Sequence, residues 1–181
     1  AIRRFRDDPI LQEDLRDVLE AAIRAPNGGD QQPWRFLVVK DRELRAQLAA
    51  LYREAWWAKR RDVGINGPED ILEENRVMRS AMRMADEIGR APVMVLVCST
   101  IQGQSGFGSV IPSVQNMLLA ARCLGIGGTI TTLHPEVAER VQRLFGGTGD
   151  GAGGVLRAVG LPPEEGFGLV ASYDRWDGPS V

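Results

Sequence analysis

The sequence predicts a single globular domain in which helices and strands are mixed along the chain. Apolar residues recur at helical spacing over residues 10–24, and residues 93–99 form a continuous apolar run that is typical of a buried strand. Long helical patterns separate the strand candidates, with neither an internal repeat nor a linker between them. The chain has 181 residues, 44% of them hydrophobic, which is long enough for one core, so we expect one domain over residues 1–181.

The charge balance and the apolar pattern exclude two classes of partner. The formal net charge is -2, and 22 Lys and Arg are interspersed with 24 Asp and Glu, so we expect no nucleic-acid partner. No apolar run approaches the roughly 20 residues of a membrane-spanning helix, and no signal-peptide core is visible, so we expect a soluble protein. Cys98 and Cys123 lie where small buried hydrophobic residues belong, which favours reduced thiols and a cytoplasmic location.

The first third of the chain predicts a helix, a strand and a second helix. The first helix spans residues 10–24, and a short apolar run at residues 36–39 predicts a buried strand. The second helix follows directly and is expected to end at Trp56 and Trp57. The glycine-rich residues 64–68 then predict an irregular segment and a mobile flap.

The middle of the chain predicts two further helices around a buried strand. A charged helix with one apolar stripe is expected over residues 69–89, and the strand at residues 93–99 is expected to be buried on both faces. A glycine-rich loop at residues 103–108 then leads into a mostly apolar helix at residues 113–124, which Gly125 helps to stop. Core packing is favoured over substrate contact for the stripe on the first of these helices, which consists of Ile71, Met78, Met82 and Ala85.

The last part of the chain predicts a hydroxyl-rich strand, a helix and two more strands. The hydroxyl-rich strand covers residues 128–133, and Pro135 opens the helix. Further strands are expected at residues 155–159 and 169–173.

Two patterns that could be mistaken for functional motifs are interpreted as structural. His134 is the only histidine, which excludes a zinc site with several histidines, and no Gly-x-Ser-x-Gly elbow accompanies it for a catalytic triad. Residues 149–154 satisfy Gly-x-Gly-x-x-Gly, but they follow a predicted helix and precede a predicted strand. A dinucleotide site needs the reverse order, so we interpret this segment as a flexible loop.

Three segments together suit the parts of one flavin cofactor. Arg3, Arg4 and Arg6 supply guanidinium groups that match phosphate oxygens, although alone they could be a solvated basic terminus. Residues 25–33 form a polar, glycine-rich loop between a helix and a strand, with backbone NH groups and short amides. Residues 129–132 add hydroxyl groups.

Four segments resemble the FMN-dependent nitroreductase family in the same order and with similar spacing. They are RRF with DPI at residues 3–10, APNGGDQQPWRF at residues 25–36, APV at residues 91–93, and PSVQNMLLAARCLGIG at residues 112–127. The resemblance covers residues 1 to about 146. It implies an α+β sandwich with a mainly antiparallel central sheet flanked by helices. It also implies an interlocked homodimer with shared active sites, in which the apolar helix at residues 113–124 would form part of the seam.

The resemblance also implies which residues bind FMN. Arg3 matches the second basic position of the family's N-terminal motif, whose first basic residue would lie before Ala1. The loop that would reach the flavin of the other subunit is matched by Pro26, Asn27, Asp30 and Gln32, with Asp30 in place of the usual Asn. The stretch beneath the isoalloxazine ring, near flavin N5, is matched by Ile130, Thr131, Thr132 and Leu133. The family's C-terminal phosphate-binding arginines have no visible match, and Arg175 is a weak substitute.

The activity implied by the resemblance is that of an FMN-dependent NAD(P)H oxidoreductase. Hydride would pass from NAD(P)H through flavin N5 to a small acceptor such as a nitroaromatic, a quinone or an activated alkene, in a ping-pong sequence, and no catalytic side chain or metal is needed. Trp56, Trp57 and Phe107 are possible walls of the acceptor pocket, with core or surface packing as alternatives. The open alternatives are a non-catalytic FMN-binding or storage protein, and a dehalogenase-like, flavin-destroying or deazaflavin-using relative.

Overall fold

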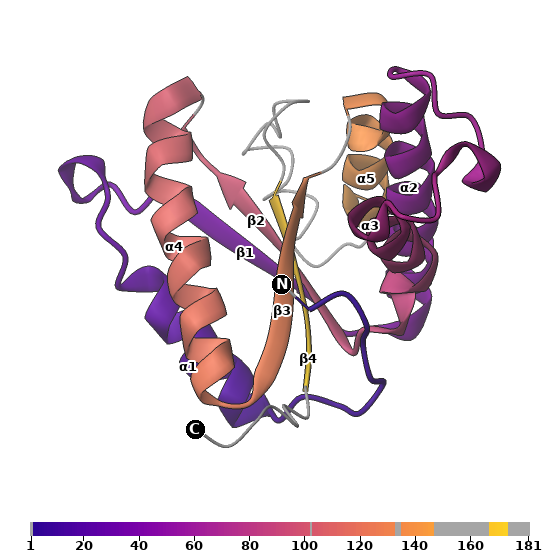
Figure 1. The fold of residues 1–181 in the computed structure, drawn as a ribbon. Helices are drawn as coiled ribbons and strands as arrows, with labels where there is room; N and C mark the ends of the chain where they lie inside the picture. Colours follow the sequence, from indigo (N-terminus) through magenta and orange to yellow (C-terminus); the bar gives the residue numbers. More distant parts are fainter. Residues whose placement is uncertain (1, 102, 133–134, 147–166, 174–181) are drawn as a thin grey trace.

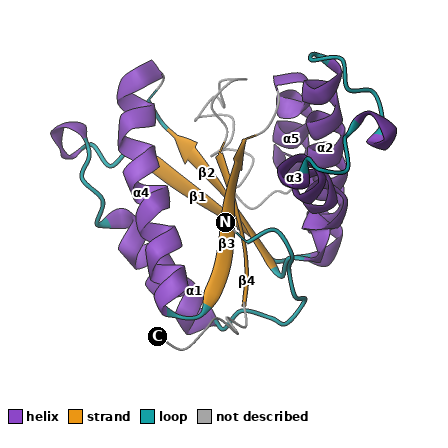
Figure 2. Ribbon diagram, viewed as in Figure 1, coloured by secondary structure: helices purple, strands orange, loops and turns teal. Residues whose placement is uncertain are grey.

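A four-stranded sheet with helices on both of its faces forms the framework of the protein. The computed structural model describes residues 2–101, 103–132, 135–146 and 167–173. Figure 1 shows α1 and α4 on one side of the sheet and α2, α3 and α5 on the other, and Figure 2 shows the same layers by type of secondary structure. The predicted α+β sandwich is therefore confirmed.

The sheet is antiparallel throughout, as predicted. Its strands are β1 (Trp34–Val39), β2 (Val93–Ser99), β3 (Ile126–Thr132) and β4 (Phe167–Tyr173), and their spatial order is β1-β2-β4-β3. β2 is buried on both faces, as expected for a central strand, whereas the middle of β1 is only half-buried because β1 lies at an edge. β3 forms the other edge.

One helical layer consists of α1 (Gln12–Ile23) and α4 (Gly103–Cys123). Apolar side chains of these helices pack on alternate residues of β2, in a cluster that includes Leu15, Val18, Ala22, Val93, Val95, Val97, Val110, Val114, Met117 and Ile126. The predicted first helix is confirmed, with ends that differ by one or two residues.

The other layer consists of α2 (Arg42–Arg61), α3 (Arg76–Glu87) and α5 (Pro135–Gly146). Side chains of these helices pack on the other face of β2, against Met94, Leu96 and Cys98. The same cluster also includes Phe5, Leu48, Tyr52, Trp56, Met84, Ala85, Val137, Val141 and Phe145. Met78 and Met82 are partly buried against it, so the core packing favoured for the methionine stripe is confirmed.

The predicted end of α2 and the predicted start of α3 are both wrong. α2 continues past Trp56 and Trp57 to Arg61, because Trp56 lies one turn after Tyr52 on the buried face and adds to the same core. α3 begins only at Arg76, where the Asn75 side chain accepts a hydrogen bond of 3.0 Å from the backbone NH of Met78.

The glycine-rich segment at residues 103–108 is helical, so the predicted loop is wrong. α4 starts at Gly103, ten residues before the predicted helix at Ser113. A Cβ atom at Gly106 would clash with the carbonyl oxygen of Ile101, so this glycine lets the first turn of α4 pack against the chain that enters it. Gly106 therefore serves close packing here, whereas a Cβ atom at Gly108 would meet open space.

The two cysteines have different environments. Cys98 on β2 is 2% exposed, as expected, and burial raises the pKa of its thiol to about 11. Cys123 is exposed, so its predicted burial is wrong: it is the last residue of α4, just before the turn that leads into β3. In the described part of the chain, no helix is both long and apolar enough to cross a membrane, and no three potential metal ligands gather.

Candidate functional site

The N-terminal segment runs along the open edge of β3 and carries Arg3 with it. The backbone NH of Ile2 donates a hydrogen bond of 3.1 Å to the carbonyl oxygen of Gly128, and Phe5 is buried in the core beneath α2. Between these two anchors, the half-buried Arg3 donates from Nη1 to the carbonyl oxygen of Val77 at 3.4 Å. The guanidinium is thus held between β3 and the first turn of α3.

A groove of about 750 Å³ lies between this N-terminal segment, β3 and α4. That volume is within the range of small-molecule sites, about 300–1,000 Å³. Two exposed apolar side chains face it, Leu119 at 56% and Ile130 at 38% exposure, and two arginines, Arg3 and Arg122, make it electropositive. Among the described residues its lining contains no carboxylate; the lining consists of Ile2, Arg3, Gln115, Leu118, Leu119, Arg122, Ile126, Gly127, Gly128, Thr129 and Ile130.

The far end of β3 is tied to α2 by two hydroxyl groups. Thr131 Oγ1 donates a hydrogen bond of 2.9 Å to the hydroxyl of Tyr52, which is 6% exposed. Burial raises the pKa of Tyr52, and this outweighs the bond from Thr131 and the positive charges of Arg60 and Arg3, which all lower it. Arg3, Arg60, Tyr52 and Thr131 therefore share one neighbourhood, although they come from three separate segments.

Arg60 lies in the last turn of α2, above two tryptophans. Its Cζ atom is 4.9 Å from the ring centroid of Trp56, and the Trp56 and Trp57 rings meet edge to face at 4.9 Å. The Nε atom of Arg60 is buried and has no hydrogen-bond partner among the described residues. Trp56 itself is a core residue, and so it does not form an open pocket wall.

The polar loop before β1 is folded on itself by its own side chains. Asn27 Oδ1 accepts a hydrogen bond of 2.8 Å from the backbone NH of Gln32, and Gln32 Nε2 donates to Asp30 Oδ1 at 3.2 Å. Gly29, Asp30 and Gln32 have φ angles of 60°, 53° and 45°, a left-handed conformation that glycine and aspartate adopt most readily. Pro26, Asp30 and Gln32 are exposed at the surface.

This loop is anchored to α4 and not to β3. The backbone NH of Gly28 donates to Ser109 Oγ at 3.3 Å, and Ser109 Oγ donates in turn to the carbonyl oxygen of Ser105 at 3.0 Å. At the other end of the loop, the backbone NH of Thr100 donates to the carbonyl oxygen of Pro33 at 2.7 Å. The loop therefore lies against the first half of α4.

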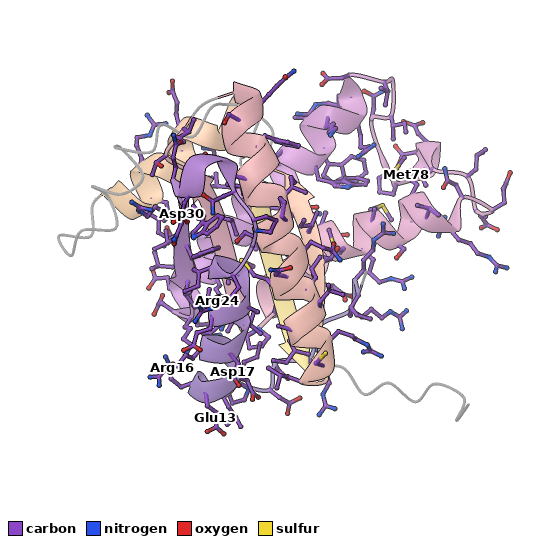
Figure 3. All side chains as sticks on the ribbon, turned by 90° about the vertical axis from the view of Figure 1, so that its left-hand side faces the viewer. Glu13, Arg16, Asp17, Arg24, Asp30 and Met78 are labelled. Atoms are coloured by element: carbon purple, nitrogen blue, oxygen red, sulfur yellow. The ribbon has the colours of Figure 1, made fainter. Side chains whose placement is uncertain are left out.

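Within one chain, the structure does not bring the loop and Arg3 together. In Figure 1 the loop lies to the left beyond α4, whereas α3, whose residue Val77 contacts Arg3, lies to the right of the sheet. Figure 3 agrees, because it shows Asp30 and Met78 on opposite sides of the molecule. One chain alone thus supplies two separated halves of the predicted site.

Several predicted features lie outside the described residues. These are Leu133, His134, the glycine pattern at residues 149–154, the strand at residues 155–159, and Arg175.

Sequence reasoning did not assign Tyr52 and Arg60 to the site. In the sequence, Tyr52 lies among apolar residues at helical spacing, and Arg60 lies in the basic run at residues 59–61. A hydroxyl on an otherwise apolar, buried helix face is a signal that could have indicated Tyr52 as a site residue, because a buried hydroxyl needs a hydrogen-bond partner.

The protein is thus an α+β sandwich, in which an antiparallel sheet lies between two helical layers and an electropositive groove lies beside an edge strand. The chain belongs to the nitroreductase family, whose family model matches residues 1–160.

Curated relatives support this assignment along most of the chain. The NADH dehydrogenase of Thermus thermophilus is 29% identical over 188 residues, which cover 92% of this chain and 84% of the relative. The iodotyrosine deiodinase of Thermotoga neapolitana is 28% identical over 163 residues, with 90% and 84% covered. Two archaeal relatives, from Archaeoglobus fulgidus and Methanothermobacter thermautotrophicus, are each 28% identical, and this chain spans 68% and 63% of their lengths.

Solved structures agree with the sequence relatives. The structure of a nitroreductase with bound FMN from Desulfitobacterium hafniense has a TM-score of 0.64 and 26% sequence identity to this chain. The match covers 100% of this chain and 87% of that one.

Proposed function

We propose that this protein is a flavin-dependent NAD(P)H oxidoreductase that binds FMN and reduces a small organic acceptor. The observation that carries the proposal is the electropositive groove beside the open edge of β3, with Arg3 held at its rim, in a chain of the nitroreductase family. FMN, when bound, supplies the hydride-accepting and hydride-donating atom N5. The protein's task is then to bind, orient and shield the reactants.

The groove has the chemistry that FMN requires. Its arginines, Arg3 and Arg122, offer positive charge for a phosphate, while Leu119 and Ile130 offer apolar surface for a planar ring. The glycines at residues 127–128 line the groove without side chains of their own, which leaves room for a flat molecule beside the strand.

The edge of β3 supplies backbone donors at the same place. The carbonyl of Gly128 points away from β4, since it accepts from Ile2. NH and CO groups of alternate residues share one edge of an antiparallel strand, so those of Ile130 and Thr132 face the same way. We infer that these NH groups donate to the flavin ring, and that the Thr131 hydroxyl is instead used to hold Tyr52.

We further propose that two copies of the chain build each site as a homodimer. Arg3 and the strand edge come from one copy, and the loop with Pro26, Asn27, Asp30 and Gln32 comes from the other, because one chain keeps these parts on opposite sides. The exposed Leu119 of α4 and Ile130 of β3 would be covered in the dimer.

The acceptor is proposed to be a nitroaromatic, a quinone or an activated alkene, reduced in a ping-pong sequence. NAD(P)H and the acceptor would then use the same face of the site in turn, so neither needs a binding pocket of its own. Reductive dehalogenation is the second candidate reaction, because one relative is an iodotyrosine deiodinase. A cytoplasmic location stays a prediction.

Anaerobic reduction tests the proposal. The protein is purified, loaded with FMN, freed of excess flavin, and mixed with NADH or NADPH without oxygen. We expect a yellow protein whose absorbance near 450 nm, the usual band of oxidised flavin, is bleached by at least one donor and restored by menadione or nitrofurazone. Binding without bleaching would indicate a storage protein. A protein that cannot be loaded with FMN would contradict the proposal, and loss of flavin absorbance with oxygen would indicate a flavin-destroying enzyme.

A further inference from the structure

A buried donor on Arg60 has no acceptor within the described structure. The Nε–H of Arg60 is shielded from solvent and makes no hydrogen bond among the described residues, and the guanidinium lies over the face of Trp56. A buried N–H without an acceptor is unfavourable, and more so on a charged group. Such a donor is suited to bind a ligand that supplies the missing hydrogen-bond acceptor.

A second donor lies in the same neighbourhood. The Tyr52 hydroxyl is paired with Thr131 Oγ1, and either hydroxyl can be the donor of this bond, so Tyr52 can turn its proton to a ligand while it accepts from Thr131. Tyr52, Trp56 and Arg60 follow each other at four-residue intervals along one ridge of α2. The effect of Arg60 on the pKa of Tyr52 is consistent with this proximity.

The charge around these donors is positive. The positive charges of Arg3, in the N-terminal segment, and of Arg60, on α2, both lower the pKa of Tyr52. Neither arginine forms an ion pair in the described part of the chain. The Arg60 Nε–H and the Tyr52 hydroxyl can each donate to one oxygen of a carboxylate, beside the positive charge of Arg60 itself. A phosphate, with a third oxygen and a higher charge, would require more donors than this pair provides.

We propose that Arg60 and the Tyr52 hydroxyl form a subsite for the carboxylate of an aromatic acceptor. The subsite adjoins the proposed flavin groove, because Tyr52 is hydrogen-bonded to Thr131, and Thr131 directly follows the groove-lining residue Ile130 on β3. The inference rests on the proposed function, because it names the class of acceptor: aromatic acids are preferred over neutral aromatics of the same shape. Arg60 is the residue that determines this preference.

Calorimetric titration with benzoate and with the neutral benzamide tests the subsite without any turnover. The full chain is titrated with and without FMN loaded. We expect benzoate to bind about tenfold more tightly than benzamide, a difference of about 1.4 kcal/mol, because a charged carboxylate accepts stronger hydrogen bonds than a neutral amide. Arg60→Gln should abolish the preference, Arg60→Lys should keep part of it, and Tyr52→Phe should weaken benzoate binding severalfold. The matched control is Arg61→Gln, at an exposed neighbouring arginine, which should leave both ligands unaffected.

Turnover provides a second, independent readout. The ratio of kcat/KM for 4-nitrobenzoate to that for 4-nitrobenzamide should fall about tenfold in Arg60→Gln, while the ratio for NADPH to NADH stays unchanged. Equal binding of benzoate and benzamide to the unmodified protein would overturn the proposal, and this result needs no variant to fold. A change confined to the NADPH to NADH ratio would overturn it as well. Bleaching by NAD(P)H without a carboxylate preference would leave the oxidoreductase proposal standing and remove this one alone.

Discussion

Thr131 on β3 donates a hydrogen bond of 2.9 Å to the hydroxyl of Tyr52 on α2, and this bond joins the strand edge of the candidate site to the opposite helical layer. β3 is an edge strand, so among the described strands it pairs with β4 alone, and its other edge carries the hydrogen bond from Ile2 to Gly128. The side-chain bond to a core residue of α2 therefore helps to hold the strand edge in place, and with it the backbone groups that we propose as flavin donors.

A double-mutant cycle should detect this coupling. Tyr52→Phe and Thr131→Val each remove one hydroxyl, and each single change leaves the other hydroxyl poorly paired, at a cost of about 1 kcal/mol. The double variant should be more stable than the sum of the two losses predicts, with a coupling of about 0.5–1 kcal/mol in urea unfolding. Additive losses would mean that the bond does not form in solution.

Asp30→Asn tests the proposed role of the loop. The amide oxygen can still accept the hydrogen bond from Gln32, and asparagine tolerates the left-handed backbone at this position. The free energy of unfolding should change by less than about 0.5 kcal/mol. FMN affinity should be equal or higher, since a negative charge near an anionic cofactor is removed; fluorescence titration of flavin measures it. A marked loss of affinity would show that the carboxylate itself is used.

Cys98 should make stability fall at alkaline pH. Its thiol ionises near pH 9.0 when unfolded, but burial raises the pKa to about 11 in the folded protein. Between these values the unfolded state binds fewer protons, so the free energy of unfolding decreases as pH rises through 9 towards 11, by up to about 2–3 kcal/mol.

Comparison with Cys98→Ala isolates this effect from other groups that titrate in the same range. The variant should be less stable at pH 7 but should lose less stability between pH 9 and 11. Thiol labelling gives a second measurement: the exposed Cys123 should react in the native state and Cys98 only after unfolding. Identical alkaline slopes for the two proteins would contradict the assignment.

Leu119→Glu should disrupt the proposed dimer. This side chain is 56% exposed, faces the groove, and would bring a carboxylate into an apolar seam. Light scattering should show a monomer with weak FMN binding and little loss of thermal stability. The matched control is Leu72→Glu, at a 65% exposed leucine before α3, which should remain a dimer. If both variants behave alike, the dimer seam lies elsewhere.

Much of the architecture could be predicted from the sequence because its signals are local. The helix at residues 10–24 and the strand at residues 93–99 follow from apolar spacing alone, and both are present. The start of α4 was missed because glycine usually interrupts a helix, whereas Gly106 is required by a close contact with Ile101 that only the folded chain reveals.

The site was predictable in its parts but not in its arrangement. Arg3 and Thr131 were identified as site residues, and the structure places both near Tyr52. The contributions of Tyr52 and Arg60 depend on how α2 packs across the sheet, which no local pattern encodes. The separation of the Asp30 loop from Arg3 is likewise a property of the whole fold.

A heterodimer of two defective chains tests most directly the claim that two copies share each flavin site. Chains with Arg3→Ala and with Asn27→Ala carry different tags, are expressed together, and the mixed dimer is isolated for measurement of bound FMN. The account predicts no FMN in either homodimer and one FMN in the heterodimer, because one of its sites then combines an intact Arg3 with an intact loop. A heterodimer that binds no FMN, like its parents, would contradict the account and place the whole site within one chain.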